Sequence, residues 1–374
     1  MPKFGLLLFA VLLSTVARAT EWKVTRARDR DYVSFENLAE FYRFTEYSHA
    51  NRTISLRCPQ RAIRAQSDMS ELSINGVRFF TNFPLLENSA GALISAFDVG
   101  KLIEPVLRPS RIVNAEPVKT IILDPGHGGT DNGTANQWGS EKTYALEVAL
   151  IARDKLRAAG FTVEMTRDKD SGISLEDRVA FANRFSDAVF VSIHFNSGSG
   201  GTGVESYALA PKGAPSNAGG SGEHHATETG GVADEGNAQD CQNIALTAAV
   251  HAAVLSQAGV YDRGVRHARF KVLRHLHIPG LLLEAGFLND PVEGRRIATP
   301  QYRQQLGLAI AQGVQSYNTA VNYRSPTPGA TATFAVVRNV LPAHARSITE
   351  PLGAPSPSAQ RAPEEPSLSI NGGE

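Results

Sequence analysis

Short apolar runs alternate with segments of helical spacing between residues 117 and 320, and this alternation constrains the fold more than any other feature. The strand-like runs are residues 119–123, 161–166, 188–193, 270–273 and 280–283. The segments with helical spacing are residues 141–159, 175–184, 239–257 and 300–317. Such alternation is typical of domains in which helices cover a parallel sheet. We therefore predict an α/β domain over residues 117–320.

A different pattern precedes this domain, in residues 22–112. Residues 32–41 begin with extended alternation and continue with helical spacing, and residues 93–103 repeat that pattern. The dipeptide Asn75-Gly76 lies between two short apolar runs, which predicts a β-hairpin. We predict a small α+β module that resembles the module at the N-terminus of copper amine oxidases, with a docking or spacing role.

The two ends of the chain are predicted to lie outside the folded part. Lys3, an apolar stretch over residues 4–13 and the small residues Ala17 and Ala19 predict a cleaved export signal over residues 1–19. The apolar stretch is shorter than the roughly 20 residues that span a bilayer, so no membrane span is expected after cleavage. Residues 325–374 are rich in Pro, Ala and Ser and are predicted to be disordered. We expect a periplasmic or secreted protein.

Charge and cysteine content exclude several classes of function. Lys plus Arg and Asp plus Glu number 37 each, so the chain has no net charge that would attract nucleic acid. The only two cysteines, Cys58 and Cys241, cannot form a disulfide framework or a cysteine zinc site. We expect no nucleic-acid partner and a monomeric chain.

Residues of the type that binds metals occur where the predicted strands end. His127, His194 and Glu284 follow three apolar runs, and Glu141 begins a predicted helix. Ligands bind at the carboxyl ends of strands in open α/β sheets, so these residues are expected to converge. Any one of them alone would be ordinary: Glu141, for example, is the kind of acid that stabilises a helix N-terminus.

Together these residues suggest hydrolytic chemistry. Two imidazoles and one carboxylate can hold a catalytic zinc ion and leave its fourth position to water. A second carboxylate near that water would act as a general base and then as a general acid. Glu284 fits this second role, because its apolar surroundings would desolvate it and raise its basicity.

Five sequence blocks carry a resemblance to a known family: Asp124–Gly129 (DPGHGG), Glu141-Lys142, Ser192–Asn196 (SIHFN), Arg263–Val265 (RGV) and Glu284–Phe287 (EAGF). In this order they are similar to the zinc-dependent N-acetylmuramoyl-L-alanine amidases of the type 3 family, over about residues 118–318.

The resemblance implies roles for four residues. His127, Glu141 and His194 would bind Zn²⁺, and Glu284 would be catalytic. The implied fold is a twisted, mostly parallel six-stranded sheet with helices on both faces. The implied reaction, on peptidoglycan, is hydrolysis of the amide between the lactyl group of N-acetylmuramic acid and L-alanine.

Several features differ from the family pattern or stay open. Arg266-His267 replaces the usual Lys, and the extra imidazole is unexplained. Residues 212–239, with Glu223-His224-His225, form either a solvated loop or a gate that a protein activator displaces. Asp124 is expected to support the turn near His127, and Arg263 to pair with an acid rather than with substrate.

Two other functions remain possible on the sequence. A zinc carboxypeptidase or endopeptidase acting within the stem peptide would use the same metal chemistry with a different pocket. A non-catalytic wall-binding protein could share the fold, but such proteins lack ligands or the acid/base, and all four positions are filled here.

Overall fold

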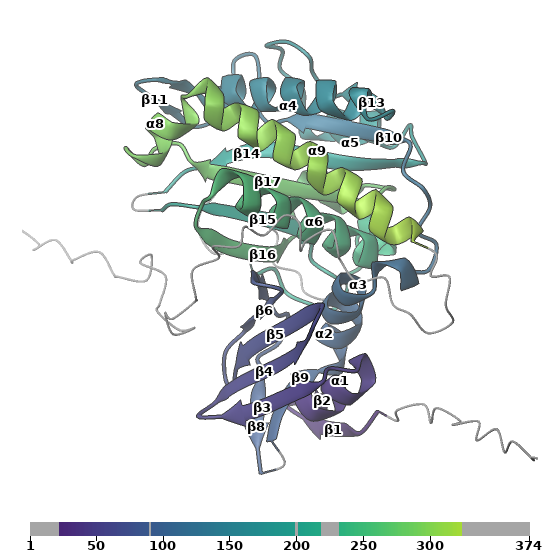
Figure 1. Cartoon of the computed structure of the whole chain (residues 1–374). Coiled ribbons are helices and arrows are strands. Elements are labelled where there is room, and N and C mark those ends of the chain that lie inside the picture. Colours follow the sequence, from purple (N-terminus) through teal and green to yellow (C-terminus); the bar gives the residue numbers. More distant parts are fainter. Residues whose placement is uncertain (1–21, 90, 199–200, 218–231, 324–374) are drawn as a thin grey trace, which may run out of the picture.

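The computed structural model describes residues 22–89, 91–198, 201–217 and 232–323. The predicted export signal (1–19), the predicted tail (325–374) and the residues Glu223, His224 and His225 lie outside the described residues. In Figure 1, helices cover a sheet in the upper part of the molecule, and the purple and blue strands of the N-terminal module lie below it.

Six strands form the sheet of the α/β part, in the order β13-β10-β14-β17-β15-β16. Their bounds are β10 (Thr120–Pro125), β13 (Thr162–Met165), β14 (Ala188–Asn196), β15 (Val204–Leu209), β16 (Asp262–Ala268) and β17 (Gly280–Phe287). The first four strands in this order are parallel, and β15 and β16 run together in the opposite direction. The prediction of a mostly parallel sheet is confirmed, but these six strands belong to a longer sheet that continues into the N-terminal module.

Helices cover both faces of this sheet, as predicted. On one face α4 (Glu141–Ala158) and α6 (Asp240–Ala258) pack against the strands, and α9 (Pro300–Asn322) packs against both helices (Figure 1). On the other face lie α5 (Leu175–Ala182) and α7 (Lys271–Arg274). The short α8 (Glu293–Ile297) follows β17. Ile121 faces the first layer of helices and its neighbour Ile122 faces the second, because successive strand residues point to opposite faces.

One prediction about strands was wrong, and one strand was missed. Residues 270–273 are not a strand, since Lys271–Arg274 form α7 and the strand β16 precedes them. A short apolar run does not by itself distinguish a strand from a buried helical turn. Strand β15 was not predicted, although Val204–Leu209 lie between Gly203 and Pro211 and include β-branched and aromatic residues.

The N-terminal module contains short antiparallel strands and few helices. Its elements are β1 (Val24–Ala27), β2 (Arg30–Ser34), α1 (Phe35–Tyr42), β3 (Glu46–Ala50), β4 (Thr53–Cys58), β5 (Arg61–Gln66), β6 (Glu71–Ile74), β7 (Val77–Phe80), β8 (Leu86–Asn88), β9 (Gly91–Ser95), α2 (Ala96–Asp98) and α3 (Glu104–Leu107). The predicted hairpin is confirmed, because Asn75 and Gly76 connect β6 to β7 with positive φ angles of 53° and 85°. The predicted repeat of strand followed by helix is found in β2–α1 and β9–α2.

The module and the α/β part share one sheet and one core. Strand β7 pairs with β16, at Phe79 and Val265, so a single sheet of eleven strands runs from β13 to β3. One hydrophobic cluster contains Leu38 and Ile63 of the module together with Val148 and Ile310 of the α/β part. The division into residues 22–112 and 117–320 stays a prediction about the sequence, and in the structure the two segments pack as one unit.

Candidate metal centre

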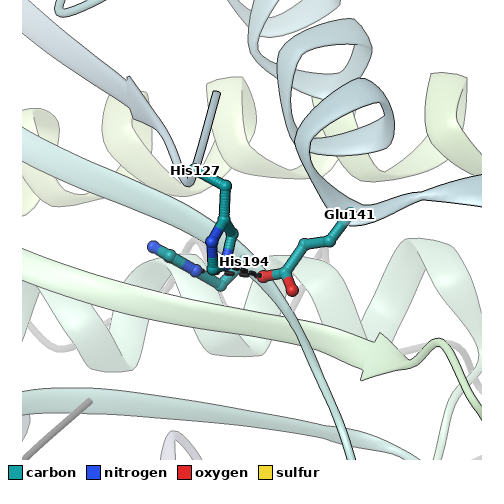
Figure 2. A group of neighbouring side chains, drawn as sticks. All are labelled: His127, Glu141 and His194. Carbon is teal, nitrogen blue, oxygen red and sulfur yellow. Dashed lines mark hydrogen bonds and ion pairs between the residues drawn. The ribbon is translucent and has the colours of Figure 1, made fainter. Parts of the chain in front are cut away.

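Two imidazoles and one carboxylate meet near the carboxyl ends of the inner strands β10 and β14 (Figure 2). His127 lies in the loop after β10, Glu141 is the first residue of α4, and His194 lies in β14. Their ligand atoms all lie within 4.8 Å of one another. Oε1 of Glu141 is 3.0 Å from Nε2 of His127 and 3.0 Å from Nδ1 of His194. All three residues are at most 9% exposed, so this polar cluster is buried.

Glycines in the loop between β10 and α4 allow these side chains to lie close to the backbone of that loop. A Cβ atom on Gly126 would lie 2.2 Å from the imidazole of His194, and one on Gly133 would lie 2.6 Å from Oε2 of Glu141. His127 itself has a φ of 59°, a left-handed conformation that is uncommon for residues other than glycine. A conformation of this kind is retained only where the surrounding structure enforces it.

Buried charges beneath the loop supply that enforcement. Asp124 is fully buried and accepts hydrogen bonds from Thr166 and Ser192, both at 2.7 Å, and from Arg178 at 2.6 Å. Arg178 in turn donates to the carbonyl oxygen of His127 at 2.7 Å. Burial works to raise the pKa of Asp124, but Arg178 together with the hydrogen bonds from Thr166 and Ser192 outweighs it and holds the pKa below its usual range. Asp124 therefore supports the turn through Arg178 and does not bind the imidazole.

Asp131 contacts Nδ1 of the His127 imidazole, and sequence analysis missed this residue. Its Oδ2 is 2.8 Å from Nδ1 of His127. Burial works to lower the pKa of His127, but the carboxylates of Glu141 and Asp131 outweigh it and raise the pKa to about 9. A histidine that ligates a metal usually has its other ring nitrogen bonded to a carboxylate or carbonyl, and this general pattern could have suggested Asp131.

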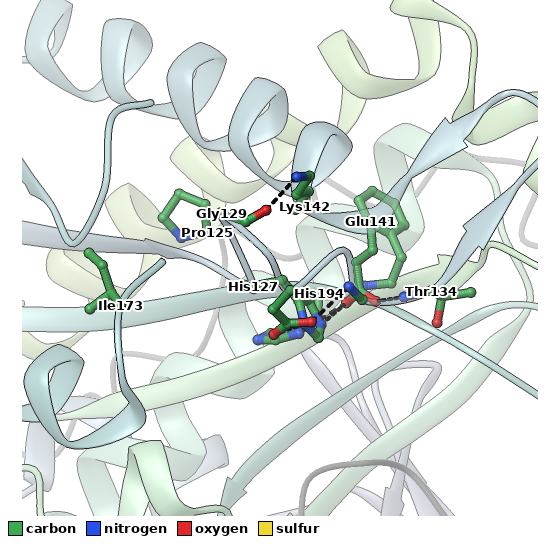
Figure 3. Close-up of polar contacts among 12 residues, drawn as sticks. Pro125, His127, Gly129, Thr134, Glu141, Lys142, Ile173 and His194 are labelled. Carbon is green, nitrogen blue, oxygen red and sulfur yellow. Dashed lines mark hydrogen bonds and ion pairs between the residues drawn. The ribbon is translucent and has the colours of Figure 1, made fainter. Parts of the chain in front are cut away.

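Backbone groups hold the carboxylate of Glu141. The amide of Phe195 donates to Oε1 at 3.0 Å and the amide of Thr134 donates to Oε2 at 2.9 Å. Next to it in the helix, Nζ of Lys142 donates to the carbonyl of Gly129 at 2.7 Å and so closes the loop over the site (Figure 3). Burial would raise the pKa of Glu141, but its hydrogen bonds with the imidazoles keep the pKa well below the usual range.

Glu284 lies beside this cluster, within β17. It pairs in register with His194 on β14 and with Glu205 on β15. His194 and Glu284 were expected at strand ends, but both lie inside strands, because β14 and β17 continue to Asn196 and Phe287. Glu284 is 6% exposed, and within the described part of the chain its Oε2 has no hydrogen-bond partner. Burial, Glu141 and Glu205 raise its pKa well above the usual range.

Glu205 is a second residue that sequence analysis missed, because it lies on the unpredicted strand β15. It is 2% exposed. Its Oε1 accepts a hydrogen bond from Asn196 at 2.5 Å, and its Oε2 accepts one from Arg263 at 3.2 Å. Arg263 thus pairs with an acid, as expected, and its guanidinium lies 4.7 Å from the centre of the Phe287 ring.

The cluster fits a transition-metal ion. Imidazole nitrogen and carboxylate oxygen are typical ligands of zinc, at about 2.0–2.2 Å, which places neighbouring ligand atoms of a tetrahedral site roughly 3.4 Å apart. The separations of the three side chains, from 3.0 Å upward and all within 4.8 Å, fit that requirement with small rotations of the side chains. Three protein ligands leave one position open, which is the arrangement of catalytic sites.

Comparison with known proteins identifies a family to which this chain is similar. A protein-family model described as N-acetylmuramoyl-L-alanine amidase matches residues 121–316, which is more than half of the 374-residue chain. A sporulation-specific N-acetylmuramoyl-L-alanine amidase of Bacillus subtilis is 33% identical over 201 residues, which cover 53% of this chain and 68% of the relative.

Two further relatives carry similar names. N-acetylmuramoyl-L-alanine amidase AmiA of Escherichia coli is 31% identical over 221 residues, covering 53% of this chain and 76% of the relative. N-acetylmuramoyl-L-alanine amidase AmiC of Neisseria meningitidis is 37% identical over 223 residues, covering 54% of this chain and 53% of the relative. The chain thus spans about half the length of the Neisseria relative.

Proposed function

Because this chain belongs to the N-acetylmuramoyl-L-alanine amidase family, we propose that it hydrolyses peptidoglycan with a zinc ion held by His127, Glu141 and His194. The bond cleaved would be the amide between the lactyl group of N-acetylmuramic acid and the L-alanine of the stem peptide. One observation carries the proposal: two imidazoles and a carboxylate share a buried point beside Glu284, a further carboxylate with an unpartnered oxygen.

The chain's own residues would divide the work of hydrolysis. When bound, a zinc ion supplies an activated water at neutral pH and polarises the substrate carbonyl. Glu284 would take a proton from the attacking water and deliver it to the nitrogen of the leaving amine. Its raised pKa suits this transfer, because a more basic carboxylate takes up a proton from water more readily. Glu141 stays ionised, which suits a ligand.

Asp131 would orient one ligand. Its contact with Nδ1 of His127 would keep a ring proton on that nitrogen and, with zinc bound, leave the lone pair of Nε2 for the metal. Arg178 would fix the same ligand from behind, through the His127 carbonyl. These two contacts support the assignment of His127 as a ligand rather than as a proton carrier.

A cellular location follows from the substrate. We propose that residues 1–19 direct export, since peptidoglycan lies outside the cytoplasmic membrane. None of the helices in the described ranges is long and apolar enough to cross a bilayer. Residues 22–112 would then form a module that accompanies the catalytic residues 117–320 into the cell envelope.

Product analysis tests the proposed function. Purified protein is incubated with cell-wall sacculi, and the soluble products are identified by mass spectrometry. We expect peptides that begin with L-alanine and glycan strands with free lactyl groups. A chelator should abolish release, and added Zn²⁺ should restore it. Products cut within the stem peptide would instead identify a peptidase, and binding to sacculi without any release would identify a non-catalytic wall protein.

A further inference from the structure

The N-terminal module contacts the strand next to the candidate acid/base, and one arginine connects the two. We propose that Arg266 is a positioning residue: Phe80 of the module holds Arg266, and Arg266 holds Glu205 away from Glu284. The proposal rests on the proposed function, because it assigns the module a part in that reaction. It also gives a role to Arg266, which stands where the family pattern usually has a lysine.

The first step is the join between the module and the α/β part. Strand β7 of the module pairs with β16 at Phe79 and Val265. The backbone amide of Arg78 donates to Oδ2 of Asp262 at 2.8 Å, and Oδ1 of the same aspartate accepts from the amide of Gly264 at 2.7 Å. Oδ1 also lies 2.9 Å from Nε2 of the buried His251. These contacts fix β16 relative to the module.

The second step is the contact between Phe80 and Arg266. The guanidinium carbon of Arg266 lies 3.7 Å from the centre of the Phe80 ring, which is cation–π geometry. The ring also packs against Gly264, where a Cβ atom would come within 2.8 Å of it. Gly264 has a φ of 98°, so this position suits glycine for two reasons. The phenyl ring therefore packs against both Gly264 and Arg266 of β16.

The third step leads from Arg266 to Glu205. Nε of Arg266 lies 3.4 Å from Oε2 of Glu205, and its Nη1 donates to the carbonyl of Asn217 at 3.0 Å. The arginine side chain is 15% exposed and the glutamate side chain 3%, so this ion pair is largely screened from water. Arg263 contacts the same oxygen of Glu205, so two cations draw this carboxylate toward β16.

The last step concerns the space around Glu284. Glu205 and Glu284 pair in register on adjacent antiparallel strands, so their side chains lie on the same face with Cβ atoms roughly 5 Å apart. Oε2 of Glu284 has no hydrogen-bond partner among the described residues. Without Arg266, one of the two cations that draw Glu205 toward β16 is lost, and the carboxylate of Glu205 could turn toward Glu284. The acid/base would then be occupied by its neighbour instead of by the reacting groups.

Four variants of the full chain test this inference, assayed on a soluble muropeptide. Arg266→Met removes the charge and keeps the length, and we expect kcat to fall about tenfold with KM, zinc content and melting temperature near wild type. Arg266→Lys keeps the charge and should retain most of kcat. Phe80→Leu should lower kcat about threefold, in line with a partly exposed cation–π contact. Phe80→Tyr keeps the ring and should resemble wild type.

Arg184→Met is the matched control, because Arg184 makes a similar contact with the ring of Phe181, at 4.2 Å, on the other helical layer. This control should leave kcat unchanged. Wild-type kcat in Arg266→Met, or a loss that appears only in KM or in zinc content, would overturn the inference. If Arg266→Met does not fold, wild-type kcat in Phe80→Leu overturns it instead. An inactive wild-type protein would refute the proposed function, which is a separate outcome.

Discussion

Two buried glutamates in this protein, Glu141 and Glu284, have the same side chain and opposite surroundings. Glu141 is bonded by two imidazoles and two backbone amides. Glu284 is about as deeply buried, yet its Oε2 has no partner in the described part of the chain. Burial alone would raise the pKa of both. Hydrogen bonds reverse this for Glu141, whereas the nearby carboxylates Glu141 and Glu205 reinforce it for Glu284.

This difference shows how one residue type can suit the two roles that we propose for it in one site. A carboxylate that stays ionised can hold a metal ion, and a carboxylate that readily holds a proton can transfer one. Residue type therefore does not distinguish the proposed ligand from the proposed acid/base. The two glutamates differ in the polar groups that neighbouring strands and helices place next to each carboxylate.

The largest expected effect comes from replacing either the proposed acid/base, Glu284, or one of the proposed metal ligands, His127. Glu284→Gln should lower kcat by about 10²–10⁴-fold, the usual contribution of general acid–base catalysis, while zinc content stays at one per chain. His127→Ala should lose both zinc and activity, because it removes one of three ligands. Metal analysis and kcat on the same samples would check this. Full activity of Glu284→Gln would remove the acid/base assignment, and full zinc content of His127→Ala would remove the ligand assignment.

A smaller effect is expected for Asp131, which contacts the proposed ligand His127 and not the metal position itself. Asp131→Asn keeps the shape of the side chain but weakens its bond to Nδ1 of His127, so zinc affinity should fall about 10- to 100-fold. The zinc-loaded variant should keep a kcat near that of wild type. Competition with a chromogenic chelator would measure the affinity. Asp168→Asn, at an exposed position on the β13–α5 connection, is the control and should not change it. Equal affinities in all three proteins would show that Asp131 does not orient the ligand.

A further effect, on stability instead of on the reaction, concerns His267, a buried group whose two ring nitrogens lack partners among the described residues. Unlike Glu284, it has no part in the proposed reaction. Burial, aided by Arg269, lowers its pKa from 6.5 to about 4. The unfolded chain therefore takes up a proton near pH 6.5 that the folded chain takes up only near pH 4. Stability is lost as the pH falls through this range, by about 3 kcal/mol, and His267 contributes no such loss above it.

His267→Leu should remove that part of the acid sensitivity. Urea unfolding of both proteins at pH 7 and pH 4 would measure it, as the change in the free energy of unfolding between the two pH values. An identical change in wild type and variant would show that His267 is not the group responsible. A smaller change in the variant would show that the buried imidazole of His267 makes the folded protein sensitive to acid. The proposed reaction gives this imidazole no role.

The sequence was a good guide to local structure and to the three residues of the candidate metal centre. The hairpin at Asn75-Gly76 follows from residues that tolerate positive φ angles, and the long helices follow from apolar spacing. His127, Glu141 and His194 could be named because each is adjacent to an apolar strand or begins a helix after one. These signals are all carried by residues close together in the chain.

The missed residues depend on contacts between distant segments. Arg178 reaches the His127 carbonyl across 51 positions, and Arg78 reaches Asp262 across 184. Asp131 is close to His127 in sequence, but only the left-handed turn at His127 directs its carboxylate to the ring. No local propensity encodes such pairings, because their energy comes from burial and hydrogen bonds that form only when the sheet is assembled.

By itself, the sequence determined the α/β class, the mostly parallel sheet and the three residues able to share a metal ion. Only the tertiary structure decided that Glu284 is flanked by Glu205, and that the N-terminal module continues the same sheet as far as Arg266. The physical reason is that strand order and register are set by packing of the whole core. A pattern of apolar residues specifies which face of a strand is buried, and the rest of the molecule selects its neighbours.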